Sequence, residues 1–372
     1  MLSIKYSLYL KNTEIISIDQ NKSEFKVLRE DLIPHQMRNN PNYMTFVSWL
    51  SDRHLPLDRQ NAKHLLNTMR LPQGSHLKVM ILTRALSLND CYWIKVEDED
   101  SWDNLNLYEN SFSNSLADIS LTGATKSKFT LTKNKISTPE TTNQGTYAKA
   151  WRKEEGITYL YKANFDRREC EAEFISSIIA NKLGIEHVPY ELLIEDGRIL
   201  CKCPNITNLE TSIIPMIHYL ESLGEFPVDI FDYMTILKND QNKFLEMLVF
   251  DGIIGNIDRH LRNWGFYMDS ETTELKGLHP LFDHNCAIDV SINFKNYPSP
   301  LVNNKTTLEL AQWAIKRTPH LLNNINNLAK WYNTKECEKL FKKTYSRLDE
   351  LDYLKELLEL VTTDKVNKII RF

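Results

Sequence analysis

The chain has 372 residues, of which 42% are hydrophobic and 25% charged, as in a globular protein long enough for two or three packed units. A formal net charge of −4 argues against nucleic acid or an anionic membrane as a direct partner. The apolar runs are too short to span a membrane. Six cysteines lack a disulfide or zinc spacing, which favours a reduced, cytoplasmic protein.

Residues 1–115 read as a separate amino-terminal accessory or recognition region. Tyr43–Leu50 and Arg59–Met69 carry apolar residues at helical spacing, and Pro56 and Pro72 punctuate them. Such periodicity predicts amphipathic helices. We therefore expect this region to be mainly helical.

Residues 116–216 show the pattern of a small lobe that clamps a nucleotide. Residues 116–150 are rich in Ser, Thr, Asn and Lys, as flexible loops are. A strand at 158–162, a helix at 170–183 and a hairpin over 188–203 follow. We expect a β-rich lobe here.

Residues 217–372 are mainly helical in pattern. The near-continuous apolar run at 244–254 predicts a buried helix, and residues 308–315 and 336–360 are amphipathic. The chain as a whole is therefore expected to be an α+β protein, with a β-rich lobe followed by a helical one.

The most informative motif is G-N-I-D-R-H-L-R-N at Gly255–Asn263. Asp258 can accept the proton of an attacking hydroxyl, and Asn263 and Asp283 offer oxygens to Mg²⁺. Residues 264–281 have the signature of a hairpin, which would return Asp283 to the neighbourhood of Asn263. We interpret this set as a phosphotransfer site.

His260 lies inside the motif and is a second catalytic candidate, as a general base. Its neighbours favour a structural role for it and for Arg259, namely hydrogen bonding within the catalytic turn. Both interpretations stay open at this point.

Lys162 ends a strand, where a kinase places the lysine that holds the α- and β-phosphates. Three glutamates follow in the next helix, and Glu173 best fits its inward face as the partner of this lysine. A solvated lysine and a solvated acidic patch are the alternative readings.

No glycine-rich phosphate motif occurs in the chain. The candidate for this role is residues 141–149, in which Gly145, Thr146 and Lys149 would contact the phosphates of ATP. A disordered linker is the competing interpretation of this segment.

Taken together, the chain resembles the HipA-like serine/threonine kinases of bacteria, including the stand-alone CtkA-like members. The resemblance rests on Gly255–Asn263, on L-H-P-L-F-D at 278–283 and on Lys162 with a downstream glutamate. It covers roughly residues 120–372, whereas residues 1–115 do not look like the usual amino-terminal subdomain of the family.

The resemblance implies a two-lobed protein-kinase-like fold, ATP and Mg²⁺ as cofactors and a protein hydroxyl as acceptor. By position it makes Asp258 the catalytic aspartate, Asn263 and Asp283 the metal ligands and Lys162 the phosphate-binding lysine. It also implies autophosphorylation near the phosphate loop, for which the candidates are Ser137, Thr138, Thr141 and Thr142.

The resemblance further allows an antitoxin-like or regulatory protein partner, besides an unidentified protein substrate. Two other functions stay open: a kinase-fold module that binds nucleotide or a partner without transfer, and a small-molecule phosphotransferase. A lipid kinase is disfavoured because residues 284–300 are nearly neutral and carry no basic run, whereas a membrane-facing loop needs several lysines.

Overall fold

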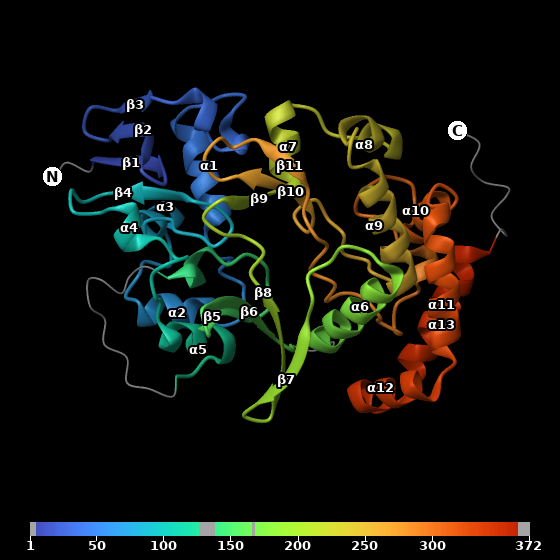
Figure 1. The fold of residues 1–372 in the computed structure, drawn as a ribbon. Coiled ribbons are helices and arrows are strands. Elements are labelled where there is room, and N and C mark those ends of the chain that lie inside the picture. Colours follow the sequence, from blue (N-terminus) through green and yellow to red (C-terminus); the bar gives the residue numbers. More distant parts are fainter. Residues whose placement is uncertain (1–4, 126–137, 166–167, 364–372) are drawn as a thin grey trace. The chain divides into compact units, whose positions relative to one another are not determined.

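The computed structural model describes residues 5–125, 138–165 and 168–363, which form two compact units (Figure 1). The first unit comprises Met1–Phe165, Leu193–Glu225 and Gly265–Lys276, and the second comprises Asp166–Leu192, Phe226–Trp264 and Gly277–Phe372. The expected segments 1–115, 116–216 and 217–372 are thus divided differently: the amino-terminal region and the small β-rich sheet share one unit.

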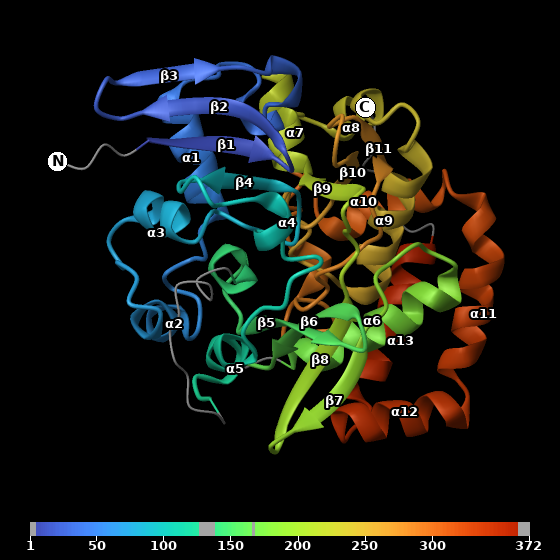
Figure 2. The ribbon, with the colours of Figure 1, turned by 60° about the vertical axis from the view of Figure 1, so that its left-hand side comes forward.

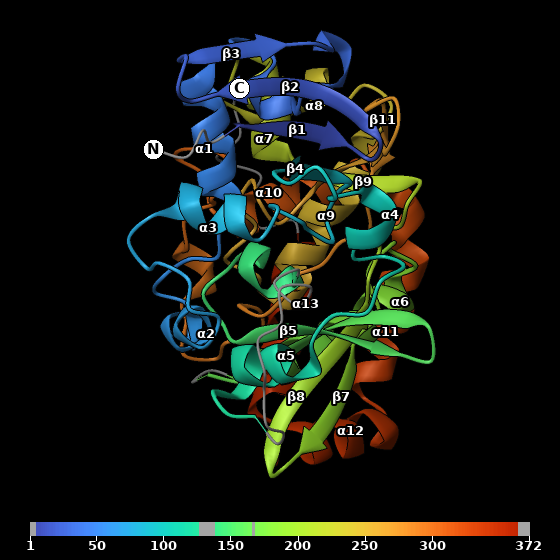
Figure 3. The same cartoon turned by 90° about the vertical axis from the view of Figure 1, so that its left-hand side faces the viewer.

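The amino-terminal region contains a four-stranded antiparallel sheet, which the expectation of a mainly helical region missed. Figure 2 and Figure 3 show its strands side by side, in the order β3-β2-β1-β4. In β1, Tyr6, Leu8 and Leu10 are buried and alternate with more exposed residues, which is the period of a strand. The elements are β1 (Lys5–Leu10), β2 (Thr13–Asp19), β3 (Glu24–Val27), η1 (Glu30–Leu32), η2 (His35–Met37), α1 (Tyr43–Arg53), α2 (Ala62–Thr68), α3 (His76–Leu82), β4 (Tyr92–Lys95) and α4 (Trp102–Leu105).

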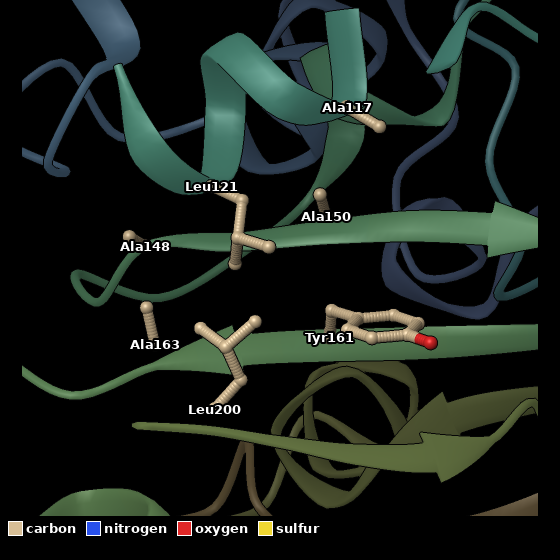
Figure 4. Close-up of a cluster of buried hydrophobic side chains, with 7 residues drawn as sticks. All are labelled: Ala117, Leu121, Ala148, Ala150, Tyr161, Ala163 and Leu200. Carbon is tan, nitrogen blue, oxygen red and sulfur yellow. The ribbon is translucent and has the colours of Figure 1, made fainter. Parts of the chain in front are cut away.

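A second sheet of the first unit has the order β5-β6-β8-β7 and confirms the expected strand and hairpin. Helix α5 packs on one face of this sheet through a small apolar core (Figure 4). The core consists of Ala117, Leu121, Ala148, Ala150, Tyr161, Ala163 and Leu200. The elements are α5 (Asn114–Thr122), η4 (Pro139–Thr142), β5 (Lys149–Glu154), β6 (Ile157–Ala163), β7 (Glu191–Glu195) and β8 (Arg198–Pro204).

A third sheet has the order β11-β10-β9, and its β10–β11 pair is the hairpin expected after the catalytic motif. Strand β9 leads directly into helix α7, which packs near η2 of the same unit. The elements are β9 (Thr211–Pro215), α7 (Met216–Leu223), β10 (Gly265–Asp269) and β11 (Leu275–Leu278).

The second unit is built around α9, the buried helix expected at 244–254. Gly252 permits its close packing on α10, because a Cβ at this position would lie 2.3 Å from the Cβ of Ala311. The helices are α6 (Glu169–Leu183), α8 (Ile230–Ile236), α9 (Gln241–Ile254), η5 (Phe294–Asn296), α10 (Thr307–Ile315), η6 (Pro319–Leu321), α11 (Leu322–Tyr332), α12 (Lys335–Tyr345) and α13 (Asp349–Thr362). Across the described residues, we find no helix with the length and hydropathy needed to cross a bilayer.

Candidate active site

The candidate catalytic loop begins where α9 ends, at Gly255. This residue has φ of 65° and caps the helix in the left-handed region, where glycine is favoured. A Cβ at Gly255 would also lie 2.8 Å from Leu357 Cδ1 and 2.9 Å from the Tyr353 hydroxyl of α13. The first glycine of the motif is therefore required both by backbone conformation and by helix packing.

Arg259 holds the loop together from inside the second unit. Its side chain is 1% exposed, and its Nε and Nη2 donate to the two Asp251 carboxylate oxygens, each at 3.0 Å. Its Nη1 donates to the Asn263 carbonyl at 3.0 Å and to the Phe282 carbonyl at 2.8 Å. One guanidinium thus joins helix α9, the end of the catalytic loop and the residue before Asp283.

Asp251 and Asn256 position the candidate catalytic aspartate. The Asn256 amide donates to Asp251 Oδ1 at 2.9 Å, and its Oδ1 accepts the Asp258 backbone N–H at 3.2 Å. Asp251 is fully buried, and its charge is matched by that of Arg259. The turn is therefore held by the buried ion pair of Arg259 with Asp251 and by the side-chain amide of Asn256. This is the structural role that the sequence favoured for Arg259.

Asp258 is half-exposed, with 44% of its side chain accessible. Burial raises the pKa of its carboxyl, and the charge of Asp283 raises it further, while His260 and Arg259 act in the opposite direction. The Cys286 thiol lies 3.8 Å from Asp258 Oδ2. An accessible carboxylate with a raised pKa is a better proton acceptor than an ordinary aspartate.

His260 has a different geometry from that of a paired general base. Its Nε2 lies 3.9 Å from Asp258 Oδ2, and its Nδ1 accepts the Arg262 backbone N–H at 3.2 Å. The ring caps the turn that carries Arg262 and remains 44% exposed. This arrangement suits the structural role better than the catalytic one.

The two candidate metal ligands lie on neighbouring segments joined by Arg259. The Asn263 side-chain nitrogen donates to the Asp258 carbonyl at 2.9 Å, so its amide oxygen is the atom that is suited to a cation. Asp283 follows Phe282 and has φ of 61°. The described residues contain no cluster of three or more His, Cys, Asp or Glu side chains that fits a metal ion. Two oxygen ligands suit Mg²⁺, which takes its remaining ligands from phosphates and water.

Glu173 of α6 contacts this metal-ligand segment. Its side chain is fully buried, and its Oε2 accepts the backbone N–H of His284 at 2.8 Å. This bond fixes the residue immediately after Asp283. The proposed pairing of Glu173 with Lys162 stays a prediction, and the structure adds a role in positioning Asp283 within the second unit.

The first unit carries the residues predicted to bind phosphates. Lys149 of β5 and Lys162 of β6 are directly opposed in the antiparallel register, and both are buried. Opposed residues point to the same face of a sheet. Their neighbours Ala148, Ala150 and Tyr161 belong to the core against α5, so the two lysines lie on the other face.

The candidate phosphate loop, residues 141–149, precedes β5. Gly145 and Thr146 are exposed, and Gly145 has φ of 92°. A Cβ at Gly145 would lie 2.6 Å from Lys149 Nζ, so the glycine lets this ammonium group approach the loop. Gly145 and the Lys149 ammonium group therefore lie close together before and at the start of β5, and the phosphate-binding role of Gly145, Thr146 and Lys149 stays a prediction.

The candidate autophosphorylation residues lie at the start of this loop. Thr138, Thr141 and Thr142 are buried, and the Thr142 hydroxyl donates to the Leu86 carbonyl at 2.8 Å. Ser137 lies outside the described residues. Phosphorylation of any of the three threonines would require the loop to leave this position.

The sequence did not predict several residues that hold the candidate catalytic loop and the candidate phosphate loop in place. Asp251 was visible as one of two acids, with Glu246, inside the apolar run at 244–254, and an acid in a buried helix signals an ion pair. Arg59 and Glu140, which contact the candidate phosphate loop, gave no local signal.

Comparison with known proteins gives a matching family and a distant curated relative. Residues 219–350 match the family described as the HipA-like C-terminal domain. A stretch of 127 residues is 24% identical to serine/threonine-protein kinase CtkA of Helicobacter pylori strain J99, and it covers 31% of this chain and 39% of that protein. The match thus spans about two fifths of the length of the curated relative.

Two solved structures are similar to this chain. The H. pylori proinflammatory kinase CtkA gives a TM-score of 0.40 at 19% identity, covering 57% of this chain and 89% of that one. HipA of Shewanella oneidensis MR-1, solved with HipB and operator DNA, gives a TM-score of 0.56 at 13% identity, covering 96% and 95%.

The Shewanella structure shows the fold that this chain shares. Because the alignment covers 96% of the chain, it includes most of residues 1–115. The expectation that residues 1–115 lie outside the resemblance is therefore corrected for the fold, because the alignment includes most of them. Residues 219–350 are thus similar to the HipA-like C-terminal domain family, and the chain shares its fold with the Shewanella HipA structure.

Proposed function

We propose that the chain is a serine/threonine protein kinase that uses ATP and Mg²⁺. The observation that carries the proposal is the Arg259 guanidinium, which joins the Asn263 and Phe282 carbonyls beside Asp258. Because these bonds tie the segments of Asp258, Asn263 and Asp283 together, the three side chains would suit the roles of a proton acceptor and two oxygen ligands of Mg²⁺. Phosphoryl transfer depends mainly on such positioning.

The residues of the second unit would act on the acceptor and the metal. Asp258 would orient the serine or threonine hydroxyl and accept its proton as the hydroxyl oxygen bonds to the γ-phosphorus. The bond from this phosphorus to the β–γ bridging oxygen would break, and ADP would leave. Asn263 and Asp283 would hold Mg²⁺ through oxygen atoms. When bound, ATP supplies the transferred phosphoryl group, and Mg²⁺ offsets the negative charge of the phosphates.

The first unit would bind the phosphates through charge and backbone amides. Lys149 and Lys162 present two ammonium groups on one face of the sheet, and Gly145 and Thr146 expose the backbone of the loop. Lysine ammonium groups and loop amides are common phosphate ligands. Glu173 would keep the segment of Asp283 in place, through the backbone of the following residue.

We propose that the autophosphorylation site is one of Ser137, Thr138, Thr141 and Thr142. A regulatory protein is the class of partner that we propose, since the Shewanella HipA was solved with HipB.

The test is incubation of the purified chain with γ-labelled ATP and Mg²⁺, followed by peptide mapping. We expect label on serine or threonine in the wild type, and a loss of at least about a hundredfold in Asp258→Ala, as expected when a general base is removed. His260→Ala is the matched control and should retain transfer. A wild type that binds ATP without transferring phosphate would favour the binding module, and failure to bind ATP would refute the kinase assignment.

A further inference from the structure

A buried arginine of the amino-terminal region contacts the phosphate loop. Arg59 precedes α2, and its side chain is 1% exposed. Its Nη1 donates to the Asn143 carbonyl at 3.1 Å, and its Nη2 donates to the Lys149 carbonyl at 2.5 Å. The same Nη2 donates to the Ser120 hydroxyl, which in turn donates to the Lys149 carbonyl. Arg59 therefore donates hydrogen bonds to carbonyls near both ends of the loop.

Glu140, the residue directly before the loop at 141–149, also takes part in this contact. Glu140 is fully buried, and its Oε2 lies 3.9 Å from Arg59 Nη2. Its Oε1 accepts the Trp151 backbone N–H at 2.8 Å, and its Oε2 accepts the Asn143 amide at 3.2 Å. Burial raises the pKa of Glu140 to about 7 and lowers that of Arg59 to about 10, while each charge opposes the shift of the other.

Backbone bonds extend the contact along residues 52–60, which we call the latch segment. The Leu55 N–H donates to the Thr141 carbonyl at 2.9 Å, and the Gln60 N–H donates to the Thr146 carbonyl at 3.2 Å. The Gln144 side chain donates to the carbonyls of Asp52 and His54, at 2.6 and 2.9 Å. The latch segment and the loop thus run side by side, within the first unit.

These hydrogen bonds bear on the low glycine content of the candidate phosphate loop. Residues 141–149 contain one glycine, whereas phosphate loops commonly use several to bring their amides close to phosphate. Here the carbonyls at 141, 143, 146 and 149 are all bonded to groups of the amino-terminal region or, for Lys149, also to Ser120. These bonds fix four of the nine carbonyl groups of the loop, so the loop conformation is held by its neighbours instead of by further glycines.

We propose that the latch segment, through Arg59, positions the phosphate loop and thereby sets the affinity for nucleotide. Arg59 is a positioning residue, since it acts on the loop and not on the phosphates. The inference rests on the proposed function for its link to ATP, while the control of loop order follows from the contacts alone. It also assigns a role to the amino-terminal region.

The test compares three variants of the full chain. Arg59→Gln removes the charge and shortens the side chain, and leaves Glu140 without its partner. Arg59→Gln with Glu140→Gln removes both buried charges, so it should fold even where the single variant does not. Arg84→Gln is the matched control, because Arg84 is 16% exposed and bonds to Asp100 in the amino-terminal region, outside the latch segment.

The first measurement is hydrogen exchange of peptides covering residues 141–149. Loss of protection against hydrogen exchange measures local opening of the loop. We expect faster exchange in this loop for both Arg59 variants, and wild-type exchange there for Arg84→Gln even if its Tm falls. Unchanged exchange in the folded double variant would overturn the inference.

The second measurement is titration with ATP and Mg²⁺. If the loop is competent only a tenth of the time, the apparent Kd rises about tenfold, which is the increase that we expect in the double variant. An unchanged Kd would overturn the link to affinity. A wild type that binds no ATP would refute the proposed function, whereas the exchange result would still decide whether Arg59 orders the loop.

Discussion

Replacement of Arg259 by glutamine tests the frame on which the candidate site is built. Arg259 and Asp251 are each 1% exposed at the side chain, so the substitution leaves a buried carboxylate without its counter-charge. Breaking a buried pair in this way costs about 3–5 kcal/mol. At about 2–4 °C per kcal/mol for a unit of this size, we expect Tm to fall by roughly 6–20 °C.

The double variant Arg259→Gln with Asp251→Asn separates the charge from the hydrogen bonds. It removes the uncompensated carboxylate and keeps an oxygen for the Asn256 amide, so it should be more stable than the single variant. Lys295→Gln is the control, because Lys295 forms an exposed pair with Glu356 and such pairs contribute little. Thermal unfolding followed by circular dichroism measures all three. A double variant no more stable than the single one would refute the reasoning.

Three further predictions concern activity and binding. Because the pKa of Asp258 is raised from 3.8, and the base must be ionised, kcat/KM should fall on acidification with a midpoint above 3.8; a midpoint at or below this value would exclude the shift. Asp283→Asn should weaken the Mg²⁺-dependent part of ATP binding, and an unchanged Mg²⁺ titration would argue against ligation. Gly145→Ala should raise the Kd for ATP several-fold, since a left-handed alanine costs about 1–2 kcal/mol and its Cβ meets the Lys149 ammonium. Gly197→Ala, at φ of 75° with open space around it, is the matched control and should leave the Kd unchanged.

The groups that could be predicted from the sequence are those whose spacing is local. Asp258 and Asn263 lie within one loop, and the hairpin at 264–281 brings Asp283 back to it by simple geometry. The helix at 170–183 could also be predicted, because it ends at Gly184, whose backbone lies in the left-handed region that favours glycine. Each of these features is decided by residues close together in the chain.

The features that could not be predicted depend on distant contacts. The bond from Arg59 to the Asn143 carbonyl spans 84 residues, and the bond from the His284 N–H to Glu173 spans 111. An arginine beside a helix is usually solvated, so the sequence does not signal the burial of Arg59. The inward face of the helix at 170–183 indicates burial of Glu173, but nothing in the sequence links it to His284. Strand β1 was different: its alternation was present in Lys5–Leu10, but it was read as part of a helical region.

The packing of Gly255 against α13 has a consequence for synthesis of the chain. Tyr353 and Leu357 belong to the last described helix, yet they contact the residue that starts the catalytic loop. Domains form as units while the chain leaves the ribosome from its amino-terminal end. The loop therefore lacks its support until α13 has emerged, and an unfinished chain carries Asp258 on an unsupported turn. The turn that carries Asp258 is thus completed only when the second unit can close on itself.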